Sequence, residues 1–257
     1  MRYELLGSLR VVTEDGSRFI TARKTATLLA TLLVRADQIV PRELLITELW
    51  GSSPPRRADA ALHVYISQLR KFLSRPGERD SPIATRPPGY LLRTDGDELD
   101  VREFQRLVET GRAHAHAGRH DQAAAALEQA LAVWRGPVPD DLRDGPVVAD
   151  FATWIEELYL ECAELLVTSH LALGRHHEPV ARLRTLISRH PLHEVLYRHL
   201  MLALYRGGRR GEALAVYAMA QETLSAELGL EPCAALRELR HSILLASEGR
   251  ENLLSTA

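Results

Sequence analysis

The stretch Ala61–Leu73, ALHVYISQLRKFL, decides how the first part of this chain folds. Its larger apolar side chains recur at steps of three and four residues, which is typical of a helix with one buried face. They are Leu62, Tyr65, Ile66, Leu69 and Leu73. The opposite side carries hydrogen-bonding groups, namely His63, Ser67, Arg70 and Lys71, with Val64 and Gln68 beside them. On an isolated helix such a side is usually only solvated, so its role depends on the segments around it.

The neighbouring segments predict a small α+β domain. Short alternating segments in residues 2–20, separated by the turn residues Glu14 to Gly16, predict an antiparallel sheet. Leucines at helical spacing predict a helix over 23–35, and Pro41 begins a second helix that ends at Trp50. The third helix is expected over 57–74, and PIATRPPGYLLR (82–93) predicts two strands joined at Pro87-Pro88-Gly89. The expected order is a sheet, three helices and a hairpin.

A third helix followed by a basic hairpin is the arrangement of a winged helix-turn-helix domain. In such domains the third helix enters the major groove of DNA, while the wing contacts phosphates. Arg and Lys can address guanine acceptors, Gln can address adenine, and an apolar side chain can contact a thymine methyl. The candidate DNA-contacting residues are His63, Val64, Ser67, Gln68, Arg70 and Lys71 on the helix, Arg56 and Arg57 before it, and Arg86 and Arg93 in the hairpin.

The charges are divided unevenly along the chain. Residues 1–93 hold 15 Lys and Arg against 9 Asp and Glu, whereas residues 94–257 hold 17 against 25. A basic part joined to an acidic part is typical of chains in which one part faces a polyanion and the other has a different task. The split therefore agrees with DNA binding by the first part.

The second part is rich in Ala and Leu at helical spacing from about Val101. The pairs Gly174-Arg175 and Gly208-Arg209 lie 34 residues apart, each between two helical segments, and 34 residues is the tetratricopeptide period. Gly118-Arg119 begins an earlier unit, and residues 136–150, which we expect to form an ordered loop, interrupt the period. Helix capping and loop solubility explain the arginines at these turns. We expect domains at 1–95 and 99–250, the second an all-α tetratricopeptide-like array with a protein-binding surface. A ligand-sensing role for this array stays open.

The sequence offers little for catalysis. It contains no GxxxxGK[ST], GxSxG or HExxH pattern, and His170, His176 and His177 lack the spacing of a metal site, so we expect surface histidines, no cofactor and no enzyme. Cys162 and Cys233 are 71 positions apart and are expected to be two reduced core thiols. The first residues lack the features of a secretory signal and no run has the length of a membrane span, so we expect a cytoplasmic protein without membrane contact.

Several motifs resemble one known family. The segments RYELLGSLRV, ELWG, LHVYISQLRKFL, TRPPGYLL, ALAVWRGP, LALGRH, HPLHE, HLMLALYR and ELGLEP closely resemble the Streptomyces antibiotic regulatory proteins. The resemblance covers nearly the whole chain. It is to the short form, an OmpR-type winged helix followed by a bacterial transcriptional activation domain, and particularly to activators of aromatic polyketide antibiotic clusters. It implies binding to tandem direct repeats near the −35 region, self-association on DNA and recruitment of RNA polymerase.

The resemblance also implies roles for single residues. It assigns base and backbone contacts to the third helix, a wing contact to Arg86 with Tyr90 bracing the hairpin, and a commonly basic position to Lys24. The loop of Gly51, Ser52, Ser53, Pro54 and Pro55 matches the polymerase-contacting segment of OmpR-type activators, although a proline-rich connector explains it equally well. Many relatives have Asn in place of Ala60 and a second Arg in place of Gln68, which bears on base preference. A protein-interaction scaffold whose first module no longer binds DNA stays open as the alternative.

Overall fold

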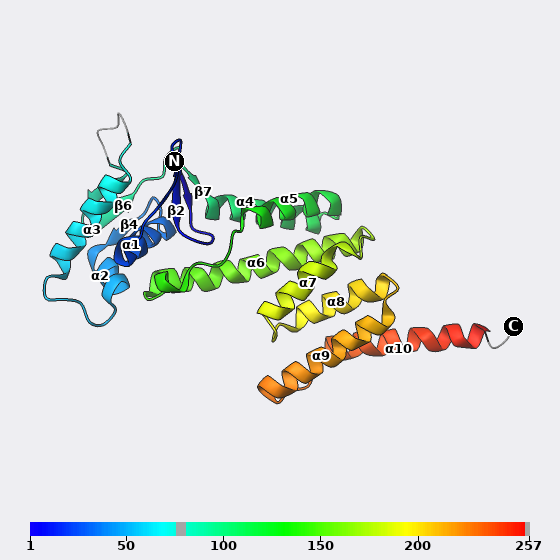
Figure 1. Ribbon diagram of the computed structural model, residues 1–257. Helices are drawn as coiled ribbons and strands as arrows, with labels where there is room; N and C mark the ends of the chain where they lie inside the picture. The colour runs from blue at the N-terminus through cyan, green and yellow to red at the C-terminus, as the bar shows by residue number, and fades with distance from the viewer. Residues whose placement is uncertain (76–80, 255–257) are drawn as a thin grey trace. The chain divides into compact units, whose positions relative to one another are not determined.

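The computed structural model describes residues 1–75 and 81–254 (Figure 1). The first sheet has the order β3-β2-β1-β7, formed by β1 (Arg2–Glu4), β2 (Arg10–Thr13), β3 (Gly16–Phe19) and β7 (Glu98–Leu99). The antiparallel pairing of β1 with β2 and of β2 with β3 confirms the sheet predicted for residues 2–20. Strand β7 pairs with β1 in parallel and was not predicted, because a strand of two residues is too short to show alternation.

Three helices follow this sheet at the predicted places. They are α1 (Arg23–Val34), α2 (Arg42–Trp50) and α3 (Ala58–Phe72), each within two residues of the predicted bounds. The apolar stripe of α3 is buried, since Leu62, Ile66, Leu69 and Leu73 are each at most 1% exposed. The third helix therefore packs with the face that its spacing predicted.

The wing is a three-stranded antiparallel sheet rather than a simple hairpin. Its order is β4-β6-β5, with β4 (Ile39–Pro41), β6 (Gly89–Leu92) and β5 (Ile83–Arg86). Strand β4 was missed because it has three residues and runs directly into α2. The backbone of β4 leaves no room for a side chain at position 89. A Cβ atom on Gly89 would lie 1.8 Å from the carbonyl oxygen of Val40, which explains the glycine. The peptide bond between Pro87 and Pro88, in the turn of the wing, is cis.

The rest of the chain is helical, as predicted. The helices are α4 (Asp100–His116), α5 (His120–Val133), α6 (Pro146–Ala172), α7 (Glu178–Arg189), α8 (Glu194–Arg206), α9 (Arg210–Leu228) and α10 (Ala234–Leu254), with a short 3₁₀ helix, η1, at Asp140–Leu142. The expectation of a loop over 136–150 is wrong for its last part. Helix α6 already begins at Pro146, a position at which proline is favourable because the first turn of a helix leaves its N–H groups unpaired.

The repeated Gly-Arg pairs end three helices in the same way. Gly118, Gly174 and Gly208 follow α4, α6 and α8 with φ values of +71°, +74° and +77°. The N–H of each following arginine donates to a carbonyl five residues earlier, on His114, His170 and Leu204, at 2.8–2.9 Å. This is the Schellman cap, which requires a left-handed residue and thereby selects glycine. The arginines also pair with carboxylates, Arg175 with Asp121 and Arg209 with Glu212, each at 2.7 Å.

Cys162 is buried, as expected, but Cys233 is exposed just before α10, so the expectation of two core thiols is wrong for Cys233. Within the described residues, none of the helices combines the length and the apolar character that crossing a membrane requires.

The chain divides into two compact units. One contains Met1–Thr110 and Glu128–Cys162, and the other Gly111–Leu127 and Ala163–Ala257. The first unit therefore includes the winged helix together with part of the helical region.

A buried carboxylate links the winged helix to α6 within the first unit. Glu48, on α2, is 1% exposed, and its two oxygens accept the N–H groups of Val147 and Val148 at 2.9 Å each. These N–H groups lie in the first turn of α6, where a helix has unpaired donors and favours negative charge. Gly145 makes room for the carboxylate, since a Cβ atom there would lie 2.2 Å from Cδ of Glu48. Glu48 thus serves as the N-terminal cap of a helix about 100 residues away.

Asp100 forms a second link of the same kind. Its carboxylate accepts the N–H groups of Leu5 and Leu6 at 2.9 Å each and lies 3.3 Å from the guanidinium of Arg135. Burial raises the pKa of Asp100, although these bonds oppose the shift. The first turn of α4 is thereby joined to the chain that leaves β1.

Replacing Glu48 by Gln tests the capping of α6. The amide can accept only through one oxygen, so one buried N–H loses its partner and the charge is lost. We expect the free energy of unfolding to fall by about 2–4 kcal/mol, measured by urea denaturation. Glu43→Gln, on the exposed side of the same helix, is the matched control and should change stability little. Equal stability of Glu48→Gln and the wild type would contradict the cap.

His199 predicts how the stability of the helical region depends on pH. It is 8% exposed in α8, and burial, with the charges of Arg198 and His193, lowers its pKa to about 4. The unfolded chain binds a proton near pH 6.5 and the folded chain does not. The free energy of unfolding is therefore at its full value above pH 6.5 as far as His199 is concerned. It falls by about 3 kcal/mol as the pH is lowered towards 4, because only the unfolded chain gains the proton in this range.

Denaturant unfolding across that range, followed by circular dichroism, would check the prediction. We expect His199→Asn to show a flatter pH dependence than the wild type. His116→Asn, at an exposed position, should keep the wild-type profile. Parallel profiles for the wild type and His199→Asn would show that His199 does not produce the dependence.

Candidate nucleic-acid interface

The polar side of α3 faces solvent. His63, Val64, Ser67, Gln68 and Lys71 are exposed, and Arg70 is half-buried. Val64, an apolar residue, is 54% exposed, as single apolar side chains on protein surfaces commonly are. Because burial of the stripe orients the helix, these side chains form one surface. We call it the recognition face.

His63 is held in place from the wing. Its Nδ1 atom lies 2.8 Å from the hydroxyl oxygen of Tyr90 on β6, and the two rings meet edge to face at 81°. The Tyr90 residue is 1% exposed, so its ring belongs to the core while its hydroxyl reaches the recognition helix. Tyr90 therefore braces α3 as well as the wing to which it was assigned.

Arg70 joins α3 to the other wing strand. Its Nε donates to the carbonyl oxygen of Ile83 at 3.0 Å, and its Nη2 donates to the hydroxyl of Thr85 at 2.8 Å. A guanidinium has five N–H donors, so these bonds leave donors for a phosphate or a base. The contact predicted for Arg70 stays a prediction, now from a side chain whose position the wing restrains.

Two further predicted residues also have partners within the domain. The Thr25 hydroxyl donates to Oε1 of Gln68 at 3.2 Å, which ties the recognition face to α1. The ammonium group of Lys24 donates to the carbonyl of Leu49 near the end of α2, where positive charge is favourable. Both residues thus stabilise the domain, whether or not they also touch DNA.

Basic residues flank the recognition face. Arg56 and Arg57 are exposed directly before α3, and Arg86 is exposed where β5 ends. Arg93, after β6, is half-buried. The loop of Gly51, Ser52, Ser53, Pro54 and Pro55 is exposed throughout, and Gly51 ends α2 with a φ of +60°. This exposure agrees with both interpretations of the loop, a polymerase-contacting segment and a proline-rich connector.

Sequence reasoning missed the residues that hold the recognition face. Thr25, Ile83 and Thr85 were not singled out, and Tyr90 was linked only to the hairpin. Their partners are 13 to 43 residues away in the chain. No sequence spacing pairs residues across a helix and a sheet, so only the three-dimensional arrangement could identify them.

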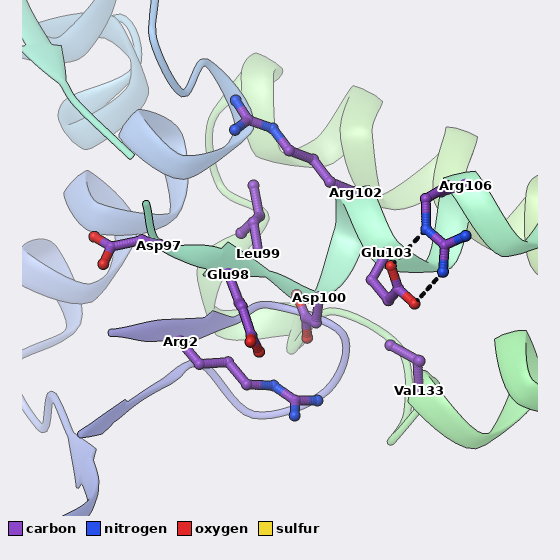
Figure 2. Close-up of a pocket in the computed structure, with 9 residues that line it drawn as sticks. All are labelled: Arg2, Asp97, Glu98, Leu99, Asp100, Arg102, Glu103, Arg106 and Val133. Carbon is purple, nitrogen blue, oxygen red and sulfur yellow. Dashed lines mark hydrogen bonds and ion pairs between the residues drawn. The ribbon is translucent and has the colours of Figure 1, made fainter. Parts of the chain in front are cut away.

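A charged cavity lies elsewhere in the first unit, where β7 leads into α4 (Figure 2). It has a volume of about 610 Å³ and is lined by side chains of both signs. Glu103 and Arg106 pair through two hydrogen bonds of 2.8 and 2.6 Å, and Arg102 donates to Asp37 and Thr94 at 2.7 and 2.9 Å. Arg102, Glu103 and Arg106 thus make their hydrogen bonds within the protein.

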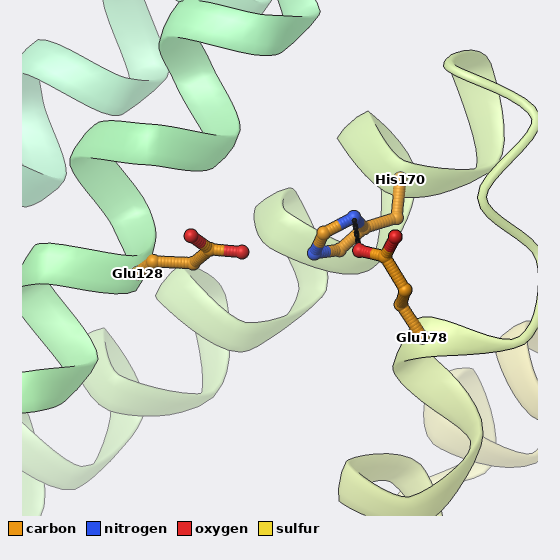
Figure 3. Close-up of side chains that lie close together, drawn as sticks. All are labelled: Glu128, His170 and Glu178. Carbon is orange, nitrogen blue, oxygen red and sulfur yellow. Dashed lines mark ion pairs between the residues drawn. The ribbon is translucent and has the colours of Figure 1, made fainter.

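In the second unit, one histidine departs from expectation. His170 was expected at the surface, but it is 4% exposed and its Nδ1 lies 2.9 Å from the carboxylate of Glu178 (Figure 3). His170 lies on α6 and Glu178 begins α7, so the pair connects consecutive helices at the repeat turn. His170 follows Leu166 and Val167 by four and three positions and shares the buried face of α6 with them, so the expectation of a surface histidine is wrong for His170.

Comparison with known proteins identifies both parts of the chain. Residues 99–244 match the bacterial transcriptional activator domain, which covers more than half of the chain. Residues 16–92 match the C-terminal domain of transcriptional regulatory proteins. The first match contains α4 to α9, and the second contains α1 to α3 with the wing.

Similar proteins are found among actinobacterial regulators. The chain is 36% identical to the regulatory protein DnrI of Streptomyces peucetius, over 97% of this chain and 94% of that protein. It is 35% identical to the transcriptional regulator RedD of Streptomyces coelicolor, over 95% and 70%. The structure of Mycobacterium tuberculosis EmbR in complex with a low-affinity phosphopeptide matches with a TM-score of 0.86 and 35% identity, over 95% of this chain and 65% of EmbR. The chain belongs to the Streptomyces antibiotic regulatory protein family of transcriptional regulators.

Proposed function

We propose that this protein activates transcription of an antibiotic or other secondary-metabolite gene cluster. It binds tandem direct repeats near the −35 region and recruits RNA polymerase. The observation that carries the proposal is the recognition face of α3, which is exposed but restrained through Tyr90 and Arg70 by the wing. A merely solvated helix face has no need of such restraint, whereas a DNA-reading helix gains affinity from side chains that are already ordered.

In this proposal α3 lies in the major groove, which admits a helix. His63, Ser67 and Gln68 offer hydrogen bonds to base edges, and Val64 offers an apolar contact to a thymine methyl. Arg56, Arg57 and Arg86 neutralise phosphates, which sets the register of the domain without reading sequence. The family membership and the basic charge of residues 1–93 support this arrangement.

Residues 1–95 would then bind DNA, and residues 99–250 would supply the activation and self-association surface. A single winged helix buries only about 600–1,000 Å² of its surface on DNA, so one copy binds modestly. Two copies on a direct repeat strengthen binding. The exposed loop from Gly51 to Pro55 is available to RNA polymerase while α3 contacts DNA. The protein would act in the cytoplasm, on the nucleoid.

Binding to operator DNA at several salt concentrations tests the DNA-binding role. Genome-wide mapping of bound DNA supplies the operator, and fluorescence anisotropy compares it with shuffled DNA. We expect a steep salt dependence for the wild type. Arg86→Ala should reduce the slope of log affinity against log salt by about 0.9, because one phosphate contact is lost. Arg182→Ala, an exposed arginine on α7, is the matched control and should leave the slope unchanged.

The two interpretations of the protein differ in this experiment. If the wild type shows no preference for any mapped sequence over shuffled DNA, the activator proposal fails. The alternative of a protein-interaction scaffold is then favoured. If Arg86→Ala has the same salt slope as the wild type, the proposed phosphate contact of Arg86 is wrong, but the rest of the DNA-binding proposal stands.

In-vitro transcription tests the role of the loop. We expect a variant carrying Pro54→Ala and Pro55→Ala to bind operator DNA with wild-type affinity but to activate transcription less, because the loop presented to polymerase loses its rigid shape. Full activation by this variant would favour the connector interpretation of the loop. Reduced operator affinity would instead show that the loop acts through the placement of α3.

A further inference from the structure

The hydrogen bond between Tyr90 and His63 bears on which ring nitrogen of His63 carries a proton. The phenol of Tyr90 is buried, and its oxygen lies 2.8 Å from Nδ1 of His63. A buried hydroxyl needs an acceptor for its proton, because an unsatisfied buried donor costs about 1–3 kcal/mol. In the part of the chain that the structure describes, Nδ1 is the partner recorded for this hydroxyl.

The direction of this bond follows from the chemistry of the two groups. A phenol is a good donor, and the unprotonated nitrogen of a neutral imidazole is a good acceptor. The reverse arrangement would leave the buried phenol proton without a partner. Tyr90 therefore donates and Nδ1 accepts, so the proton of the neutral ring resides on Nε2.

The position of the ring places that proton on the exposed side. Nδ1 and Nε2 lie on different edges of the imidazole, separated by Cε1. Nδ1 faces the buried phenol of Tyr90, whereas His63 as a whole is exposed on the recognition face. The edge that carries Nε2 is therefore the one available to a ligand.

We infer that Tyr90 fixes His63 in the Nε2–H tautomer, so that α3 presents a hydrogen-bond donor at this position and selects a base that offers an acceptor in the major groove. This inference rests on the proposed DNA binding. The acceptors in the major groove are purine N7, guanine O6 and thymine O4, whereas the amino groups of cytosine and adenine are donors. His63 would favour the first set and be opposed by the second. Tyr90 is in this sense a positioning residue for specificity.

The tautomer can be measured without DNA. Nitrogen-15 NMR of the histidine-labelled full chain in alkaline buffer distinguishes Nδ1–H from Nε2–H rings, and His63→Ala assigns the signal. We expect the wild type to show the Nε2–H form. Tyr90→Phe, which keeps the buried ring and removes only the hydroxyl, should show a mixture of both forms. An Nδ1–H signal in the wild type would overturn the inference even if the protein binds DNA.

The consequence for specificity requires operator DNA with single altered bases. Each major-groove acceptor is removed in turn, for example by 7-deazapurines in place of purines, and each base is also replaced by the other three. We expect one position at which the wild type loses about three- to tenfold in affinity when the acceptor is removed, and His63→Ala loses nothing further. In Tyr90→Phe the discrimination at that position should fall by about threefold, and it should be unchanged elsewhere.

Tyr197→Phe is the matched control. Tyr197 is 1% exposed in α8 and its hydroxyl donates to the carbonyl of Pro191 at 2.9 Å, so this variant also loses one buried phenol hydrogen bond. It should resemble Tyr90→Phe in its effect on stability but retain wild-type discrimination. If Tyr90→Phe lowers affinity for all sequences equally, Tyr90 has only a structural role and the inference fails.

The outcomes separate this inference from the proposed function. If the wild type binds no DNA selectively, the proposed function fails, and with it the selection of a base. If the wild type is selective but Tyr90→Phe discriminates as the wild type does, the proposed function stands and the inference is wrong.

Discussion

Burial of the apolar stripe of α3 is the interaction on which the candidate interface depends. Leu62, Ile66, Leu69 and Leu73 are almost completely buried, and burying side chains of this size stabilises a fold by about 1.5–3 kcal/mol each. The stripe permits only one rotation of the helix about its axis, because any other would expose these residues to water. The polar side is consequently directed to solvent, and the Arg70 and His63 side chains are placed where the wing strands can bond to them.

The wing converts an exposed face into an ordered one. Exposed polar side chains normally move among several rotamers, and a ligand that binds them must restrict this motion. His63, Gln68 and Arg70 each have a partner in a different element, namely β6, α1 and β5. For His63 and Arg70 this order depends on the three-stranded sheet, which in turn depends on the absence of a side chain at Gly89, since β4 passes directly over it.

Buried carboxylates connect the winged helix to the helical region inside the first compact unit. Glu48 caps α6, and Asp100 binds the backbone after β1. A carboxylate with two N–H partners is a directional contact, because both bonds must be made at once for the burial of the charge to be favourable. The helices of the winged helix and the start of the activator domain consequently belong to one compact unit, joined by the bonds between Glu48 on α2 and the first turn of α6.

The sequence alone determined what is periodic or local in this protein. The amphipathic stripe of α3, the bounds of α1 to α3 and the glycine caps after α4, α6 and α8 follow from backbone rules that act within a few residues. Tertiary structure decided the rest: the added strands β4 and β7, the pairing of His170 with Glu178, the exposure of Cys233, and the bonds from Tyr90 to His63 and from α6 to Glu48. These contacts join residues between 8 and 100 positions apart, or rest on strands of two or three residues. No short-range pattern encodes them, because each depends on which surfaces meet once the apolar faces are buried.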